Sequence, residues 1–144
     1  MRLDATLILI CLAIYARSFD AEFAYDDHHA IVGNVDVVGQ QPISRIWFAD
    51  FWGVPLNHSL THKSWRPATV LLFRVIYLIF GATATAFHTL SLVAHCIVTV
   101  IVFHLAPRIG LSKESATSAA LLFAVHPVHA GTALFKVPFD LITM

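Results

Sequence analysis

Two adjacent carboxylates, Asp26 and Asp27, have the type and spacing to do chemistry. They follow Phe23, Ala24 and Tyr25, behind a short apolar run and ahead of a far more apolar remainder. Neighbouring carboxylates repel each other, so the position needs water or partners, and the repulsion favours keeping a proton on one of them. Such a pair suits general acid or base catalysis. The alternative is a solvated turn after a membrane segment, and the pair alone does not decide between the two.

The composition predicts a membrane protein. Of the 144 residues, 58% are hydrophobic and 12% are charged, and the mean hydropathy is +0.74, well outside the balance of a soluble domain. Nine Lys and Arg against nine Asp and Glu leave no basic excess for nucleic-acid binding. Cys11 and Cys96 lie in apolar runs, which favours small buried hydrophobes over a disulfide framework. No dinucleotide, P-loop or zinc-protease pattern occurs.

The apolar segments predict an all-α membrane protein with three spans. Residues 1–19 are expected to form the first transmembrane anchor, with Arg2 and Arg17 beside its apolar run. That run is shorter than the roughly 20 residues of a span, so a cleaved signal peptide is the alternative. Residues 85–106 make the best transmembrane helix, and residues 115–144 are expected to form a third, with an atypical end.

Residues 20–84 are predicted to form a polar loop with two short helices that rest on the membrane surface, at about 42–52 and 68–80. Tryptophan and phenylalanine concentrate in this loop, as is typical of segments at headgroup depth. We expect that placement rather than an aromatic core of a small loop domain. Asn57, followed by His58 and Ser59, is a possible N-glycosylation site if the loop is luminal.

The topology follows from the turn at residues 107–114. It contains Arg108 and Lys113, and the positive-inside rule places it in the cytoplasm. Counting back across one span puts the loop with Asp26 and Asp27 on the luminal side, provided that residues 68–80 do not cross the membrane.

Polar residues at spacings of three and four mark one face of the helix at 85–106, namely His88, Ser91, His95 and Thr99. In lipid this face should meet protein, either as a substrate channel or through interhelical hydrogen bonds. Metal binding by His88 and His95 is disfavoured, because seven residues separate them by about 10 Å along the helix.

Several stretches occur together in an order that one family shares. They are Phe23-Ala24-Tyr25-Asp26-Asp27, Ala30-Ile31-Val32 with Asn34-Val35-Asp36, Asp50-Phe51-Trp52-Gly53, Ser64-Trp65-Arg66-Pro67 with Phe73-Arg74, Phe87-His88 with His95, and Phe123-Ala124-Val125-His126-Pro127-Val128-His129. In these stretches the chain resembles the transmembrane and tetratricopeptide-repeat protein O-mannosyltransferases.

The resemblance implies a multi-span glycosyltransferase of the endoplasmic reticulum with a GT-C-type helical bundle. Such an enzyme transfers mannose, with inversion, from dolichyl-phosphate mannose to Ser or Thr of secretory-pathway proteins, cadherin-type domains among them. No metal or other cofactor is demanded.

By the same resemblance Asp26 would be the catalytic carboxylate, with Asp27 beside it. The residues implied in binding the donor phosphate or substrate are Arg66, Arg74, His88, His126 and His129.

The chain departs from the family pattern after His129. The family continues with Thr-Glu and later Gly-Arg, where this sequence has Ala130-Gly131 and Lys136-Val137-Pro138-Phe139. We therefore expect a fragment that corresponds to the N-terminal portion of such an enzyme. An inactive truncated isoform, or a small membrane adaptor without enzymatic activity, is the alternative.

Overall fold

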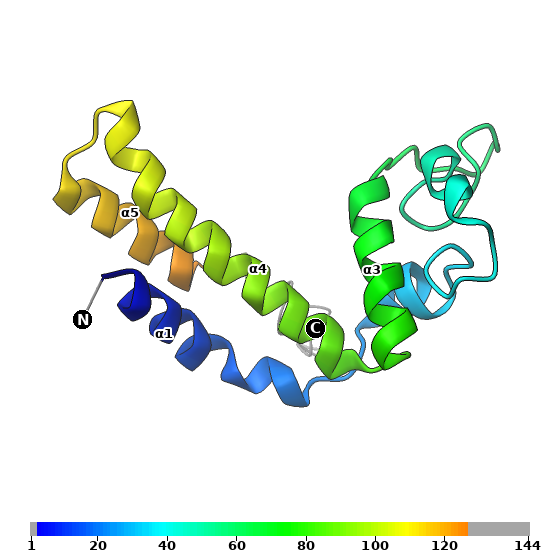
Figure 1. Cartoon of the computed structure of the whole chain (residues 1–144), viewed down its shortest axis with the longest axis horizontal. Helices are drawn as coiled ribbons and strands as arrows, with labels where there is room; N and C mark the ends of the chain where they lie inside the picture. The colour runs from blue at the N-terminus through cyan, green and yellow to red at the C-terminus, as the bar shows by residue number, and fades with distance from the viewer. Residues whose placement is uncertain (1–2, 127–144) are drawn as a thin grey trace, which may run out of the picture. The chain divides into compact units, whose positions relative to one another are not determined.

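The computed structural model describes residues 3–126, which divide into two compact units (Figure 1). We call residues 3–21 and 88–126 the helical unit, and Glu22–Phe87 the loop unit. The described residues form helices and loops, with one isolated β-bridge between Ala49 and Pro55 and no strand. The all-α prediction is confirmed for this part of the chain.

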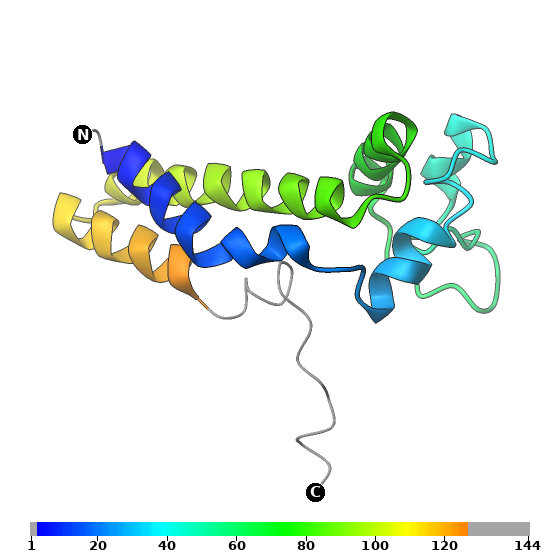
Figure 2. The same cartoon turned by 90° about the horizontal axis from the view of Figure 1, so that it is seen from below.

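Three helices make up the helical unit: α1 (Leu3–Tyr15), α4 (Ala84–Leu105, from His88 onward) and α5 (Lys113–Val125). The short helix η1 (Ala16–Asp20) extends α1, and η4 (Ala106–Ile109) leads from α4 towards α5. Figure 2 shows the three long helices side by side. Leu7 packs with Phe103, whereas Tyr15 packs with Leu92, so α1 runs antiparallel to α4.

On α5, small side chains face the interior of this unit. Ala116, Ala120 and Ala124 are fully buried and lie four residues apart on α5. A stripe of small residues lets helices approach closely, as in membrane bundles. Leu7, Leu92 and Phe103 are buried, but many other large apolar side chains are exposed. Those exposed on α1, α4 and α5 are Ile8, Leu9, Leu12, Ile14, Val93, Ile97, Val98, Ile101, Leu105, Leu122 and Val125. This distribution suits contact with lipid chains.

Residues Ala84–Ile109 form the one described helix long and apolar enough to cross a membrane. The 22 residues of α4 span about 33 Å, enough for a hydrocarbon layer of about 30 Å. Only 28% of its most apolar window is buried in the chain, unlike a core helix of a soluble domain.

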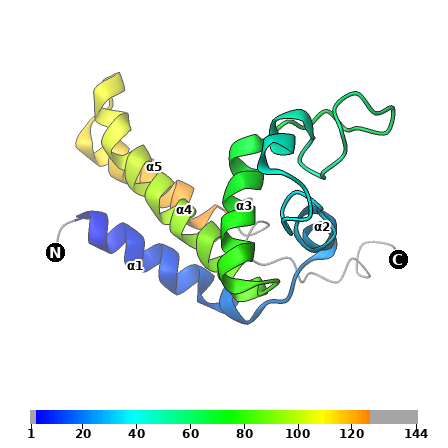
Figure 3. The same ribbon diagram turned by 45° about the vertical axis from the view of Figure 1, so that its right-hand side comes forward.

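The loop unit contains α2 (Tyr25–Asp27), the π-helical turn η2 (His28–Val32), η3 (Ile43–Phe48) and α3 (Pro67–Phe80), seen in Figure 3. Pro67 occupies the first turn of α3, and Gly81, with a φ of 66°, ends it. This unit has its own core of buried residues and partly buried aromatic rings, made of Phe23, Ala30, Ile31, Val37, Ile46, Phe51, Trp52, Val70, Phe73, Ile76, Tyr77 and Phe87.

Two expectations about this loop are therefore corrected. Phe51 and Trp52 pack in an aromatic core, whereas Trp47, Phe48 and Trp65 are exposed. The expectation that this loop has no aromatic core was wrong, because α3 and the start of α4 supply packing partners for the rings. The helix expected at 42–52 is shorter, since the side chain of Asp50 accepts hydrogen bonds from the backbone that follows it.

Candidate active site

The carboxylates of the acidic motif have different surroundings. Phe23 anchors the segment, with its ring centre 5.7 Å from that of Phe87 and 6.1 Å from that of His28. Asp27 is half-buried and its Oδ2 accepts a 2.9 Å hydrogen bond from the Ala24 N–H, which stabilises the first turn of α2. Asp26 is exposed, and its carboxylate makes no hydrogen bond or ion pair with the described residues. Of the two, Asp26 is therefore open to a substrate.

A buried polar network fixes the loop behind this motif. Asp36 is fully buried, and its Oδ2 accepts a 2.6 Å charged hydrogen bond from Arg45. The other guanidinium nitrogen of Arg45 donates to the Gly53 carbonyl at 2.9 Å. Asn34, also fully buried, donates to the Phe51 carbonyl. A Cβ at Gly53 would lie 2.6 Å from the Asn34 Oδ1, so this position requires glycine.

Asp50 organises the second half of the loop. Its Oδ1 accepts from the N–H groups of Trp52 and Val54, each at 2.9 Å. Its Oδ2 accepts from the Thr61 hydroxyl at 2.7 Å and from the His62 N–H at 3.1 Å. Burial acts to raise the pKa of Asp50, but these four hydrogen bonds outweigh it and hold the pKa below its ordinary value. Asp50 is thus an ionised structural residue.

The two arginines assigned to phosphate binding differ in their contacts. Arg74 donates through Nη1 to the carbonyls of Asp36 at 3.2 Å and Gln41 at 2.9 Å, so it holds the backbone of the loop. Arg66 is exposed, with its guanidinium carbon 5.2 Å from the centre of the Phe51 ring. A guanidinium stacked on a ring still presents its N–H groups at its edge. Arg66 is therefore the better placed of the two to receive an anion.

The structure does not join the acidic motif to these arginines. Neither Asp26 nor Asp27 forms a hydrogen bond or ion pair with Arg66 or Arg74, although all four lie in the loop unit.

The predicted substrate-binding histidines lie elsewhere in the chain. His88 is buried on α4 and His126 is exposed just after α5, both in the helical unit, while His129 lies outside the described residues.

The polar face of α4 is used largely for helix packing. The ring of His95 stacks on Phe123, and its Nε2 lies 3.2 Å from the Ala124 carbonyl oxygen, which also accepts from the Tyr15 hydroxyl. That carbonyl lies in the last turn of α5, where the carbonyl groups have no N–H donor within the helix. Thr99 is buried against Cys11. The polar face was expected to form either a substrate channel or interhelical hydrogen bonds, and His95 and Thr99 form interhelical hydrogen bonds.

The possible glycosylation site is accessible. Asn57, His58 and Ser59 are all exposed in the loop between Pro55 and Leu60. Nothing within the described structure covers the acceptor amide, so its use depends on which side of the membrane the loop occupies.

The sequence alone assigned no role to the buried Asn34, Asp36 and Asp50 or to the half-buried Arg45. A signal was present, because three of them are polar positions within the apolar and aromatic stretches that carry the family resemblance. Their burial depends on contacts between residues far apart in the chain, which spacing does not reveal.

Comparison with known proteins confirms the family resemblance. The chain is 41% identical over 120 residues to Protein O-mannosyl-transferase Tmtc1 of Drosophila melanogaster, covering 83% of this chain and 14% of the relative. It is 41% identical over 127 residues to the mouse Protein O-mannosyl-transferase TMTC3, covering 88% and 14%. The human Protein O-mannosyl-transferase TMTC4 is 37% identical over 140 residues, covering 83% and 18%.

The chain thus spans about one seventh of the length of the first of these relatives, and over that stretch it is homologous to them. No family model matches the chain, and no solved structure matches it.

Proposed function

We propose that this chain, a homologue of protein O-mannosyl-transferases over most of its length, is the acceptor-activating part of such an enzyme. The observation that carries the proposal is the homology itself, which extends over more than four fifths of the chain at about 40% identity. The structure adds support, because Asp26 is exposed and without partners among the described residues while Asp27 stabilises the turn that presents it.

In the proposed reaction, mannose moves from dolichyl-phosphate mannose to a Ser or Thr hydroxyl of a protein, cadherin-type domains being candidate acceptors. Asp26 accepts the hydroxyl proton as the oxygen attacks the anomeric carbon from the side opposite the leaving phosphate. The C–O bond to the acceptor forms while the bond to the phosphate oxygen breaks, and the configuration inverts. This scheme requires no metal or other cofactor.

Arg66 is proposed to bind the phosphate of the donor. Its guanidinium is exposed and lies over the Phe51 ring, a geometry that leaves N–H groups for a phosphate. Arg74 is assigned a structural role instead, because it already donates to two loop carbonyls. Binding roles for His88, His126 and His129 remain predictions.

The proposed location is the membrane of the endoplasmic reticulum, as part of a GT-C-type helical bundle. The loop unit lies on the luminal side, where secretory proteins pass, and the turn at 107–114 lies in the cytosol. The length and hydropathy of Ala84–Ile109 and the outward apolar side chains of the helical unit support the membrane placement.

A donor experiment tests the function. Residues 3–126 would replace their aligned counterparts in the full-length mouse TMTC3, and microsomes with this hybrid would receive an acceptor protein. We expect labelled mannose to transfer from dolichyl-phosphate mannose and not from GDP-mannose when synthesis of the lipid donor is blocked. If the hybrid reaches the membrane but transfers mannose from neither donor, the enzymatic proposal fails and the adaptor alternative is favoured.

A further inference from the structure

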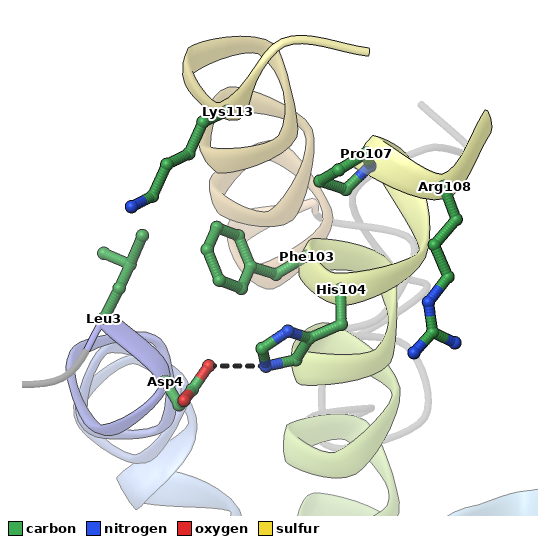
Figure 4. Close-up of a pocket in the computed structure, with 7 residues that line it drawn as sticks. All are labelled: Leu3, Asp4, Phe103, His104, Pro107, Arg108 and Lys113. Carbon is green, nitrogen blue, oxygen red and sulfur yellow. Dashed lines mark hydrogen bonds and ion pairs between the residues drawn. The ribbon is translucent and has the colours of Figure 1, made fainter. Parts of the chain in front are cut away.

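A cavity of about 560 Å³ lies at one end of the helical unit, and none of the residues assigned to mannosyl transfer lines it. Figure 4 shows its lining, which comes from the start of α1, the end of α4, η4 and the start of α5: Leu3, Asp4, Phe103, His104, Pro107, Arg108 and Lys113. All seven belong to the same unit.

The charges in this cavity favour an anion. Arg108 and Lys113 are exposed and flank His104 on opposite sides in Figure 4. The one carboxylate in the lining, Asp4, is engaged by His104, whose Nε2 lies 2.9 Å from its Oδ1. Glu114 is next to Lys113, and hydrogen bonds with its own backbone and with Ser112, together with a smaller effect of the Lys113 charge, lower its pKa. Neither Arg108 nor Lys113 uses its side chain for a hydrogen bond or ion pair within the described residues, so both can contact a ligand.

The position of the cavity indicates where the anion comes from. It lies at the end of Ala84–Ile109, the helix that is long and apolar enough to cross a membrane. The same stretch of sequence carries large exposed apolar side chains, namely Leu105, Ile109 and Leu111. Basic and exposed apolar residues together at the end of such a helix suit the phosphate and acyl regions of a lipid leaflet. A freely soluble anion would gain nothing from these exposed apolar side chains.

We propose that this cavity binds the phosphate headgroup of an anionic phospholipid, held by Arg108 and Lys113. By the positive-inside rule the leaflet is the cytosolic one, which carries the anionic lipids. The site is independent of the proposed transferase activity, so either proposal can fail without the other.

Native mass spectrometry of the 144-residue chain in detergent tests the site. The chain would be titrated with phosphatidic acid and with phosphatidylcholine of the same acyl chains. Each cation near an anionic lipid favours binding about fivefold. We expect Lys113→Gln to weaken phosphatidic acid binding about fivefold, and R108Q/K113Q about 25-fold, with phosphatidylcholine binding unchanged.

Lys63→Gln is the matched control, because it removes the same charge from an exposed residue of the loop unit. It should leave the lipid preference intact. Equal losses for Lys63→Gln and Lys113→Gln, or an unchanged preference in R108Q/K113Q, would overturn the proposal. Displacement of phosphatidic acid by excess inorganic phosphate would also overturn it, in favour of a soluble anion. The helical content of each variant, followed by circular dichroism, shows that the fold is kept.

Discussion

Replacing Asp50 by asparagine should destabilise the loop unit far more than the same substitution at Asp26. Asparagine keeps an oxygen for the N–H groups of Trp52 and Val54, but it replaces Oδ2 by an amino group. That group faces the His62 N–H, so one hydrogen bond becomes a contact between two donors.

The magnitude follows from the four contacts. Hydrogen bonds to a charged group contribute about 1.5–3 kcal/mol each, and those to a neutral group about 0.5–1.5 kcal/mol. One bond is lost and the others are weakened, while the cost of burying the carboxylate is removed. We therefore expect the free energy of unfolding to fall by about 3 kcal/mol. Asp26→Asn removes an exposed charge without a described partner and should change it by about 0.5 kcal/mol or less.

The tryptophans provide the assay. All three in the chain, Trp47, Trp52 and Trp65, belong to the loop unit, so their fluorescence reports on its unfolding within the intact protein. Urea unfolding in detergent would be followed for the wild type, Asp50→Asn and Asp26→Asn. Equal midpoints for the two variants would refute the structural role of Asp50.

The pH dependence gives a second readout of the same residue. Because the pKa of Asp50 is lower in the folded than in the unfolded chain, the unfolded chain binds more protons between the two values, and stability there rises with pH. This contribution is complete above the ordinary pKa of 3.8 and is lost as the pH falls through the folded pKa. The unfolding free energy of Asp50→Asn should therefore vary less below about pH 4 than that of the wild type.

Three further outcomes are expected. Arg66→Ala should raise the KM for the lipid donor in the transfer assay with little change in the free energy of unfolding. Arg74→Ala should instead lower the free energy of unfolding by about 1–3 kcal/mol, because two carbonyls lose their hydrogen-bond donor. The reverse pattern would exchange the roles of the two arginines. Ala120→Leu should destabilise the helical unit by about 1–3 kcal/mol by overpacking a fully buried position, measured by thermal loss of helicity in detergent, with exposed Leu122→Ala as the mild comparison. Asn57→Gln should abolish an endoglycosidase-sensitive size shift of the chain in microsomes, and a shift that persists in this variant would contradict glycosylation at Asn57.

The helices that begin and end at special residues could be predicted from the sequence. Pro67 and Gly81 mark the ends of α3, and the uncharged run after Gly81 marks α4, since proline fits a first helical turn and glycine adopts a positive φ. Local chemistry decides these positions, so they can be read without knowledge of the tertiary fold.

The interior of each unit could not be predicted in the same way. One core contains four phenylalanines from separate parts of the sequence, Phe23, Phe51, Phe73 and Phe87. These contacts are long-range, and no periodicity in the sequence predicts them. The buried alanine stripe of α5 was also missed, because alanine is common on either face of a helix.

In the acidic motif, too, one part could be predicted from the sequence and another could not. Its sequence identifies two adjacent carboxylates as candidates for the catalytic residue and gives no reason to distinguish one from the other. The structure separates them through one backbone contact, the hydrogen bond from Ala24 to Asp27. Differences between neighbouring identical residues depend on the local turn, which the residue types alone do not define.

The most direct test of the proposed catalytic role is a comparison of Asp26→Asn with Asp27→Asn in the full-length hybrid, measured as initial rates of mannose transfer from dolichyl-phosphate mannose. Both variants should fold, because an asparagine at position 27 keeps an oxygen for the Ala24 N–H and because Asp26 is exposed. We predict a loss of about 100-fold or more for Asp26→Asn, typical of a missing general base, and a much smaller loss for Asp27→Asn. Equal rates for Asp26→Asn and the wild type would contradict the assignment of Asp26 as the general base.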